Sequence, residues 1–282
     1  IRKVTGVQTC ALPSVAQDKA LLVADPSSLW AEVSTTNAQG EMLCAVGEQL
    51  VQILRSEVQP LEIMLKDGLL TRNYEQDIAN ARAAQLLARC ARQIANVKSD
   101  LRILEIGGGT GSATFPVMEE LSNAAEESPS FASYTFTDIS PGFFENVRTK
   151  LAKWSKRIIY KKLDISQDPA SQDFALEDYD LIIASNVLHA TADMAVTLDN
   201  VRRLLKPNGK LLLLEGICHS PAALPFSLLP GWWYAEDDFR SHDEGPLLST
   251  AAWQRLLSAR GFSGVDGALG DYPGTPEHMM SV

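Results

Sequence analysis

The amino-acid sequence predicts an α/β fold with a mostly parallel β-sheet, preceded by a helical lobe. From Leu101 onward, short apolar runs alternate with helical stretches, as is typical of βαβ units. Residues 27–98 instead carry apolar side chains at helical spacing. We therefore expect a helical N-terminal lobe over residues 15–98 and an α/β core over residues 99–282.

In the lobe, two helices are predicted most strongly. Residues 40–58 have apolar side chains at helical spacing, and Pro60 ends this helix or starts the next. Residues 79–97 are rich in Ala, Leu and Arg, which favour helices. Residues 69–77 between them are expected to form a turn and a short helix. The apolar residues of the first helix are Leu43, Val46, Leu50, Ile53 and Leu54.

In the core, strands and helices are expected in turn. The strands are residues 101–107, 133–139, 158–165, 179–187 and 209–217. The helices are residues 112–123, 141–153, 193–205 and 249–262, the last of which Gly261 is placed to end. Residues 205–210, LKPNGK, give a turn signal, and residues 278–282, HMMSV, read as a strand that begins where the chain stops.

The composition is ordinary for a soluble globular protein, with 45% hydrophobic and 21% charged residues among 282. A formal net charge of −10 disfavours nucleic-acid partners, because their phosphates would repel the chain. No apolar run approaches the roughly 18 residues that a membrane helix needs, so no membrane partner is expected.

The four cysteines, Cys10, Cys44, Cys90 and Cys218, are scattered without a CxxC pair. This spacing favours neither a zinc site nor a disulfide framework, so we expect a reducing compartment, the cytoplasm, and no metal. Residues 1–14 lack clear periodicity and the apolar core of a signal peptide, and we interpret them as an artefactual leader. Both ends of the sequence suggest a fragment of a longer protein.

A glycine-rich turn follows the first core strand, in the stretch LEIGGGTGSAT. Gly107, Gly109 and Gly111 let the backbone turn tightly and approach a ligand, and the next helix offers free N–H groups. A dinucleotide fingerprint would need a third glycine at Ser112, and the next acid that ends a strand, Asp138, comes 27 residues after Gly111, so that match is poor. A tight turn without a ligand is the plain alternative.

With Glu105 before the glycines, this turn resembles motif I of class I S-adenosylmethionine-dependent methyltransferases. Ligands of a parallel sheet lie beyond the carboxyl ends of its strands. There, Asp138 is placed to accept hydrogen bonds from ribose hydroxyls, Asp164 to take an adenine amino group, and Ile165 to pack on the ring. Each acid taken singly has a second interpretation as a helix N-cap.

The next two strands end in Asn186 and His189 and in Glu215. Asn186 is a candidate for the methionyl part of the cofactor, with a turn-forming Asn as the alternative. A neutral histidine can act as a general base near pH 7, so His189 is a candidate base. A carboxylate on its other nitrogen fixes the tautomer. In the methyltransferase fold that motif I resembles, these two strands are neighbours, and neighbouring strands lie roughly 4.7–4.9 Å apart, so Glu215 is expected to reach His189.

Several longer stretches are similar to the C-methyltransferase domain of fungal-type highly reducing polyketide synthases, including hybrids with peptide synthetases. They are LEIGGGTGSAT, YTFTDISPGFFENVR, LDISQDP, YDLIIASNVLHAT, VRRLLKPNGKLLLLE and LPGWW, and the likeness covers residues 40–282. The resemblance implies a Rossmann-like class I methyltransferase core with helices on both faces, and S-adenosyl-L-methionine as cofactor. It also implies methylation of the α-carbon of a β-ketoacyl chain held on the phosphopantetheine of an acyl carrier protein, in an iterative synthase whose other domains share the polypeptide.

The resemblance also assigns residues. It implies that His189 and Glu215 are the catalytic pair, and that Tyr74 of the lobe reaches the active site. Of Trp232 and Trp233, one is expected to line the acyl or pantetheine entrance and the other to pack in the core. The chain departs from the family in reading GGGTGS for GAGTGG, and AEDDFR where a glycine–arginine pair is common.

Alternatives remain for both residues and function. His189 can be a core or helix-start histidine, Glu215 a solvated acid, and His219 a rival base. Other functions are a stand-alone O- or N-methyltransferase for a small metabolite, a non-catalytic scaffold within a synthase, or a dinucleotide-dependent reductase. The intact glycine loop argues against the scaffold, and Ser112 argues against the reductase.

Overall fold

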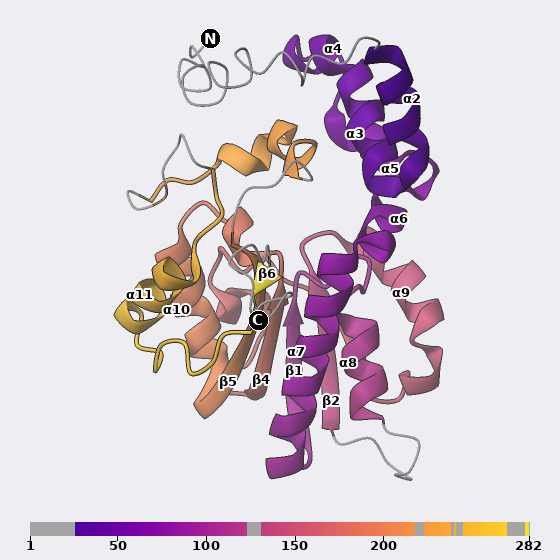
Figure 1. Cartoon of the computed structure of the whole chain (residues 1–282). Helices are drawn as coiled ribbons and strands as arrows, with labels where there is room; N and C mark the ends of the chain where they lie inside the picture. The colour runs from indigo at the N-terminus through magenta and orange to yellow at the C-terminus, as the bar shows by residue number, and fades with distance from the viewer. Residues whose placement is uncertain are drawn as a thin grey trace.

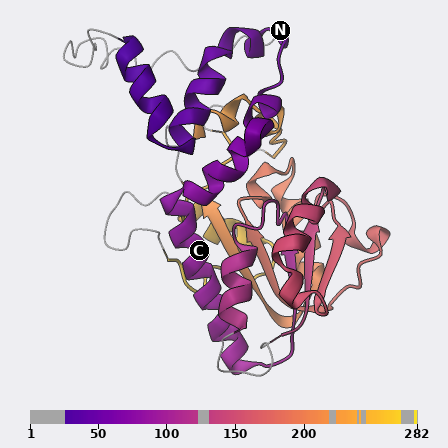
Figure 2. The same cartoon turned by 90° about the vertical axis from the view of Figure 1, so that its right-hand side faces the viewer.

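The computed structural model describes residues 26–122, 131–217, 223–237, 240, 245–269 and 280–281. A group of short helices lies at one end of a sheet-and-helix core, as Figures 1 and 2 show from two sides. Predictions about residues 1–14, Cys10, Cys218 and His219 lie outside the described residues. In the described part, no helix is long and apolar enough to cross a membrane.

The lobe is helical, as predicted. Its helices are α2 (Pro26–Thr36), α3 (Ala38–Glu48), α4 (Leu50–Leu54), α5 (Pro60–Leu65) and α6 (Leu69–Gln76). The helix predicted over residues 40–58 is broken at Gln49, and Leu50 and Leu54 are 40% and 71% exposed. The buried side chains are Met42, Val46, Ile53 and Met64, which form a small core of their own. Pro60 starts α5.

The core holds one six-stranded sheet in the order β3-β2-β1-β4-β5-β6. The strands are β1 (Leu101–Ile106), β2 (Phe131–Asp138), β3 (Ile158–Lys162), β4 (Tyr179–Ser185), β5 (Leu205–Gly216) and β6 (Met280–Ser281). The first five are parallel, and β6 pairs antiparallel with the end of β5. The predicted mostly parallel sheet is confirmed.

Helices cover both faces of this sheet. One face packs against α7 (Ile78–Val97), α8 (Thr114–Leu121) and α9 (Phe144–Lys150), and the other against α10 (Met194–Leu204) and α11 (Thr250–Ala259). Strands covered on both faces are expected to be continuously apolar, and residues 181–184 of β4 are 0% exposed. Each such side chain contributes about 1.5–3 kcal/mol by leaving water.

The long helix α7 belongs to the core by its packing. Ala83, Leu87 and Ala91 are buried in the same cluster as β1 and β2, and Figure 1 shows α7 running beside β1. The sequence division at residue 98 assigns this helix to the lobe. The division into a lobe and a core stays a prediction. The helices before residue 78 pack in the small cluster of the lobe, whereas α7 packs on the sheet.

Two predicted turns have specific geometries. Residues 205–210 do not separate α10 from the strand but bulge within β5, because the pairing jumps from Tyr179↔Leu205 to Leu181↔Lys210. Asn208 lies in this bulge with φ +65°. At the end of α11, Gly261 has φ +82°, a left-handed conformation that favours glycine and ends the helix, as predicted.

Candidate active site

The glycine loop lies directly after β1 and has one open position. Gly107, Gly109 and Gly111 all have positive φ, of +64°, +51° and +84°. A Cβ added at Gly107 would lie 2.4 Å from Val187, and one at Gly111 would lie 2.7 Å from Phe115. A Cβ at Gly109 would meet only the carbonyl oxygen of Gly107, at 3.9 Å. Gly107 and Gly111 therefore allow Val187 and Phe115 to pack closely against the loop, whereas Gly109 faces open space.

Asp138, at the end of β2, lies against this loop. Its Oδ2 accepts a hydrogen bond from the Gly109 N–H at 3.0 Å, and its Oδ1 accepts one from the Ser140 N–H at 2.8 Å. A carboxylate has about four acceptor sites, so two remain for hydroxyl donors. The structure thus brings Asp138 and Gly109 together.

Asp164 and Ile165 follow the next strand, β3. Asp164 Oδ1 accepts from the backbone N–H and the hydroxyl of Ser166, at 3.0 and 2.6 Å, so this acid also caps its own turn. Ile165 is only 4% exposed and packs in the core cluster that includes α10. Its carbonyl accepts a hydrogen bond from the amide of Asn200. The adenine-binding role of both residues stays a prediction.

Glu105 lies beneath the loop, fully buried. Its Oε2 accepts hydrogen bonds from the hydroxyls of Thr114 and Tyr134, at 2.7 and 2.8 Å, while Oε1 has no partner among the described residues. Burial is the main cause that raises the pKa of Glu105 from 4.5 to about 7, and the charge of Asp138 adds to it. This acid is therefore partly protonated near neutral pH.

Glu105→Gln is expected to remove a pH dependence of stability. The Glu105 carboxyl has a pKa of 4.5 in the unfolded chain and of about 7 in the folded protein. Between these two pH values the unfolded chain has lost the proton while the folded protein keeps it, so the free energy of unfolding of the unchanged protein falls as pH rises, relative to that of the Gln variant. The difference amounts to about 3 kcal/mol, fully present below the unfolded pKa and lost above the folded one. Urea unfolding of both proteins at about pH 4 and about pH 8 measures it. A stability difference that is the same at both values would contradict the raised pKa.

His189 and Glu215 meet at the ends of β4 and β5. These strands are neighbours, with Ser185 paired to Leu214, and each residue lies just beyond that pair. His189 Nδ1 lies 2.5 Å from Glu215 Oε2, and the two side chains are 13% and 3% exposed. Because a carboxylate only accepts, Nδ1–H is the donor. Glu215 Oε1 also accepts from the Leu188 N–H at 3.0 Å, which fixes the acid.

Asn186 connects three parts of the fold. It has φ +50°, as a turn-forming Asn does, and its N–H donates to the Leu214 carbonyl. Its side-chain oxygen accepts from the Gly216 N–H at 3.2 Å, and its side-chain nitrogen donates to Asn80 at 3.3 Å. The side chain therefore already has two protein partners. Contact with a cofactor stays a prediction for this residue.

The three residues predicted to contact substrate occupy different places. Tyr74 lies beside Phe226, with ring centroids 6.1 Å apart. Burial, with a smaller contribution from Asp77, raises the pKa of Tyr74 to about 12, so the hydroxyl keeps its proton and can donate. Trp232 lies edge-on to His189, with centroids 6.2 Å apart, whereas Trp233 is 47% exposed and donates to the Ser227 carbonyl. Of the two tryptophans, Trp232 is the one beside His189, and because neither is buried, the prediction that one packs in the core is wrong.

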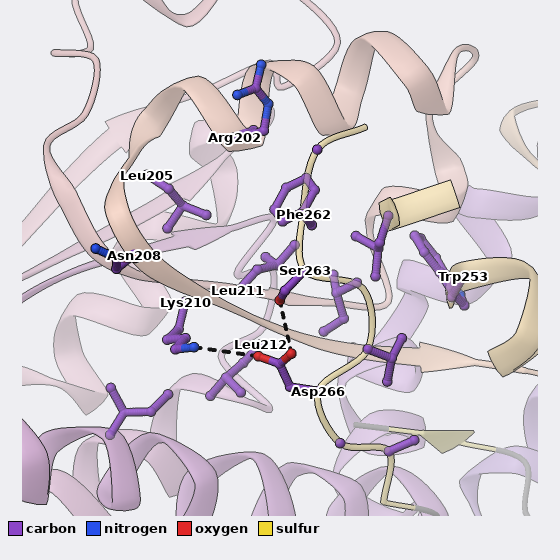
Figure 3. Close-up of a pocket in the computed structure, with 18 of the residues that line it drawn as sticks. Arg202, Leu205, Asn208, Lys210, Leu211, Leu212, Trp253, Phe262, Ser263 and Asp266 are labelled. Carbon is purple, nitrogen blue, oxygen red and sulfur yellow. Dashed lines mark hydrogen bonds and ion pairs between the residues drawn. The ribbon is translucent and has the colours of Figure 1, made fainter. Parts of the chain in front are cut away.

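A pocket of about 790 Å³ lies along β5. Leu211, Leu212, Trp253 and Phe262 line it, and Figure 3 shows Asp266 bridging Lys210 and Ser263 across it. Its lining combines apolar and polar groups and includes Glu215, but neither His189 nor the glycine loop. We therefore place the candidate active site at the strand ends and not in this pocket.

Comparisons with known proteins show what this chain is similar to. The family described as "Methyltransferase domain" matches residues 104–211, from Leu104 in β1 through the middle of β5. The highly reducing polyketide synthase PKS2 of Leptosphaeria maculans is 53% identical over 258 residues, or 92% of this chain and 10% of that protein. Fusarin C synthetase of Gibberella moniliformis is 44% identical over 86% of this chain and 6% of that protein. The chain spans about a tenth or less of these curated relatives.

Two solved structures match over most of both chains. The trans-methyltransferase CalH, in complex with SAH, has a TM-score of 0.78 and 34% identity, covering 93% of this chain and 73% of that one. The CurJ carbon methyltransferase has a TM-score of 0.71 and 32% identity, covering 90% and 68%. The chain belongs to the C-methyltransferase domains of polyketide synthases. This membership confirms the family that the sequence motifs indicate and removes the reductase alternative.

The C-methyltransferase domain also uses residues that the sequence did not single out. Gly108 packs under Phe136, where an added Cβ would lie 2.2 Å from the ring. Asn80, 3% exposed on α7, binds Asn186. Arg240 is 2% exposed and holds the loop that carries His189. A buried asparagine or arginine is unusual enough to mark a specific role, but burial is invisible in the sequence.

Proposed function

We propose that this domain transfers a methyl group from S-adenosyl-L-methionine to the α-carbon of a β-ketoacyl thioester carried on the phosphopantetheine of an acyl carrier protein, within an iterative polyketide synthase. The observation that carries the proposal is the His189–Glu215 pair, 2.5 Å apart, at the sheet edge that also holds the glycine loop. A base and a cofactor loop at one edge suit methylation of a weakly acidic carbon.

The residues at this edge suit the cofactor. Gly109 leaves open the space that a side chain would fill, and Asp138 lies beside it with acceptor sites left for two hydroxyls. Gly107, Gly109 and Gly111 would hold its methionyl part, and Asp138 and Asp164 its ribose and adenine. When bound, S-adenosylmethionine supplies an electrophilic methyl. The similar CalH structure is a complex with SAH, which supports this cofactor.

The protein side of the reaction centres on His189. Because Nδ1 is engaged by Glu215, Nε2 is the nitrogen that can take the α-proton of the substrate. The enolate that remains carries the electron pair that forms the new carbon–carbon bond. Glu215 stabilises the imidazolium, and its own position is fixed by the Leu188 N–H. Trp232 packs edge-on to the imidazole.

A direct assay tests the proposal. The purified domain is mixed with S-adenosylmethionine and β-ketobutyryl pantetheine, and the product is examined by mass spectrometry. We expect a mass gain equal to one methylene, located at the α-carbon. Methyl transfer to a phenol or an amine, with none to the thioester, would instead support a stand-alone O- or N-methyltransferase.

A carrier-bound substrate tests the partner. The same β-ketobutyryl group on an acyl carrier protein is expected to react with a lower KM than the pantetheine form, because docking adds contacts. Equal KM values would argue against carrier recognition by this domain. The neighbouring synthase domains and the cytoplasmic location stay predictions from the sequence.

A further inference from the structure

We propose that Arg240 and Asp237 form a positioning pair that holds the backbone of His189 in place for proton transfer. The inference rests on the proposed role of His189 as the base. Arg240 and Asp237 lie outside the glycine loop and the strand ends, and their buried ion pair would affect catalysis through the position of His189.

The first observation is how Arg240 binds the catalytic loop. Its Nη1 donates to the carbonyl of His189 at 2.9 Å, and its Nη2 donates to the carbonyls of Thr191 and Ala192, each at 2.7 Å. The side chain is 0% exposed. One planar guanidinium therefore joins three carbonyls within four consecutive residues, including that of the base itself.

The second observation is the carboxylate that pairs with this cation. Asp237 Oδ1 lies 2.6 Å from Arg240 Nε, and Oδ2 lies 2.7 Å from Nη2. Asp237 Oδ2 also accepts from the Met194 N–H at 2.9 Å, at the start of α10. The Glu236 N–H donates to the Ala192 carbonyl at 2.8 Å. Glu236, Asp237 and Arg240 thus hold the loop from His189 to Met194 at both ends.

The third observation is that this loop has little regular structure of its own. His189 lies in a single 3₁₀ turn, η6 (Leu188–Ala190), and the chain then runs irregularly to α10. A buried ion pair often contributes little net stability because both charges lose water. The hydrogen bonds from Arg240 to the loop carbonyls, however, determine where the imidazole of His189 lies. A displacement of about 1 Å can cost about 100-fold in rate, so position is the sensitive quantity.

Arg240→Lys tests the inference. Lysine keeps the charge beside Asp237 but cannot present a planar fork to three carbonyls. We expect kcat to fall by about 10–100-fold, with KM for β-ketobutyryl pantetheine and the Kd for S-adenosylhomocysteine changed by less than about threefold. The matched control is Arg260→Lys, which alters the Arg260–Asp199 pair between α11 and α10. That variant is expected to keep the kcat of the unchanged domain.

A second readout reports on the base directly. In D₂O with S-adenosylhomocysteine, where no methyl can be transferred, exchange of the substrate α-proton measures deprotonation alone. For Arg240→Lys, we expect the enzyme-catalysed exchange rate, after subtraction of spontaneous exchange, to fall by the same factor as kcat. A kcat equal to that of Arg260→Lys, or exchange that stays at the unchanged domain's rate, would overturn the inference.

Asp237→Asn covers the case in which Arg240→Lys does not fold. It keeps the guanidinium and its carbonyl contacts but removes the charge that anchors it, so a smaller loss, about 3–30-fold in kcat, is expected. A folded Asp237→Asn protein with unchanged kcat would count against the pair. If the unchanged domain itself neither exchanges nor methylates the thioester, the proposed function fails, which is a separate result.

Discussion

His189→Ala is expected to lower the rate of methyl transfer by about 10²–10⁴-fold, the range that a positioned general base contributes. Binding of S-adenosylmethionine is expected to be unchanged, because His189 contacts Glu215 and Trp232 and not the glycine loop. Single-turnover methylation of β-ketobutyryl pantetheine, with the cofactor affinity measured by calorimetry, checks both parts. Unchanged methylation by the variant would place the base elsewhere.

The comparison that sharpens this result is His219→Ala. His219 follows Glu215 by four residues and is the rival base in the sequence. We expect His219→Ala to methylate normally. Normal methylation by His189→Ala together with loss of methylation by His219→Ala would identify His219 as the base. Glu215→Gln adds a third measurement: its amide still accepts from Nδ1–H but has no charge to stabilise the imidazolium, so a loss smaller than that of His189→Ala is expected.

Gly109→Val is expected to abolish useful cofactor binding. The Cβ would project into the open space at the loop, and the branched side chain would fill the space that the cofactor needs. We expect the Kd for S-adenosylmethionine to rise by about 100-fold or more, equivalent to about 3 kcal/mol. Calorimetry of the folded variant measures this. A normal affinity would show that the cofactor does not use the loop.

Gly68→Val is the matched control for that experiment. Gly68 has φ +68°, close to the +51° of Gly109. An added Cβ at Gly68 meets nothing within 4 Å, and one at Gly109 meets only the Gly107 carbonyl oxygen, at 3.9 Å. Both variants therefore pay a similar backbone strain, on the order of 1–3 kcal/mol. Gly68 lies in the lobe between α5 and α6, so only Gly109→Val should lose cofactor affinity. Equal loss in both would indicate a general effect on stability.

The sequence predicted the core well because its central strands, β1, β2 and β4, are largely buried on both faces. Such strands are short apolar runs that stand out from the helices between them, and their parallel order places all their carboxyl ends at one edge. This reasoning located Asp138 beside Gly109 and brought His189 to Glu215. It worked less well for residues 40–58, where Leu50 and Leu54 show helical spacing but face solvent.

Arg240 could not be predicted because its partners are distant in the chain. It lies 51 residues beyond His189, in the stretch AEDDFRSHDE, whose composition is typical of an exposed loop. Asn80 and Asn186 are 106 residues apart and are joined by one hydrogen bond between a helix and a strand end. Contacts of this kind depend on how elements pack, and no local spacing records them.

The break between α6 and α7 determines where the lobe could rotate relative to the sheet. α7 is 20 residues long, about 30 Å, and its buried side chains fix it to the sheet. Phe226, Leu228 and Leu229 pack instead into the small core of the lobe. A rotation of the lobe would therefore hinge at Asp77, the one extended residue between the two helices. The segment from Phe226 to Leu229 would travel with it, and such a rotation would draw Trp232, three residues further along the chain, away from the imidazole of His189.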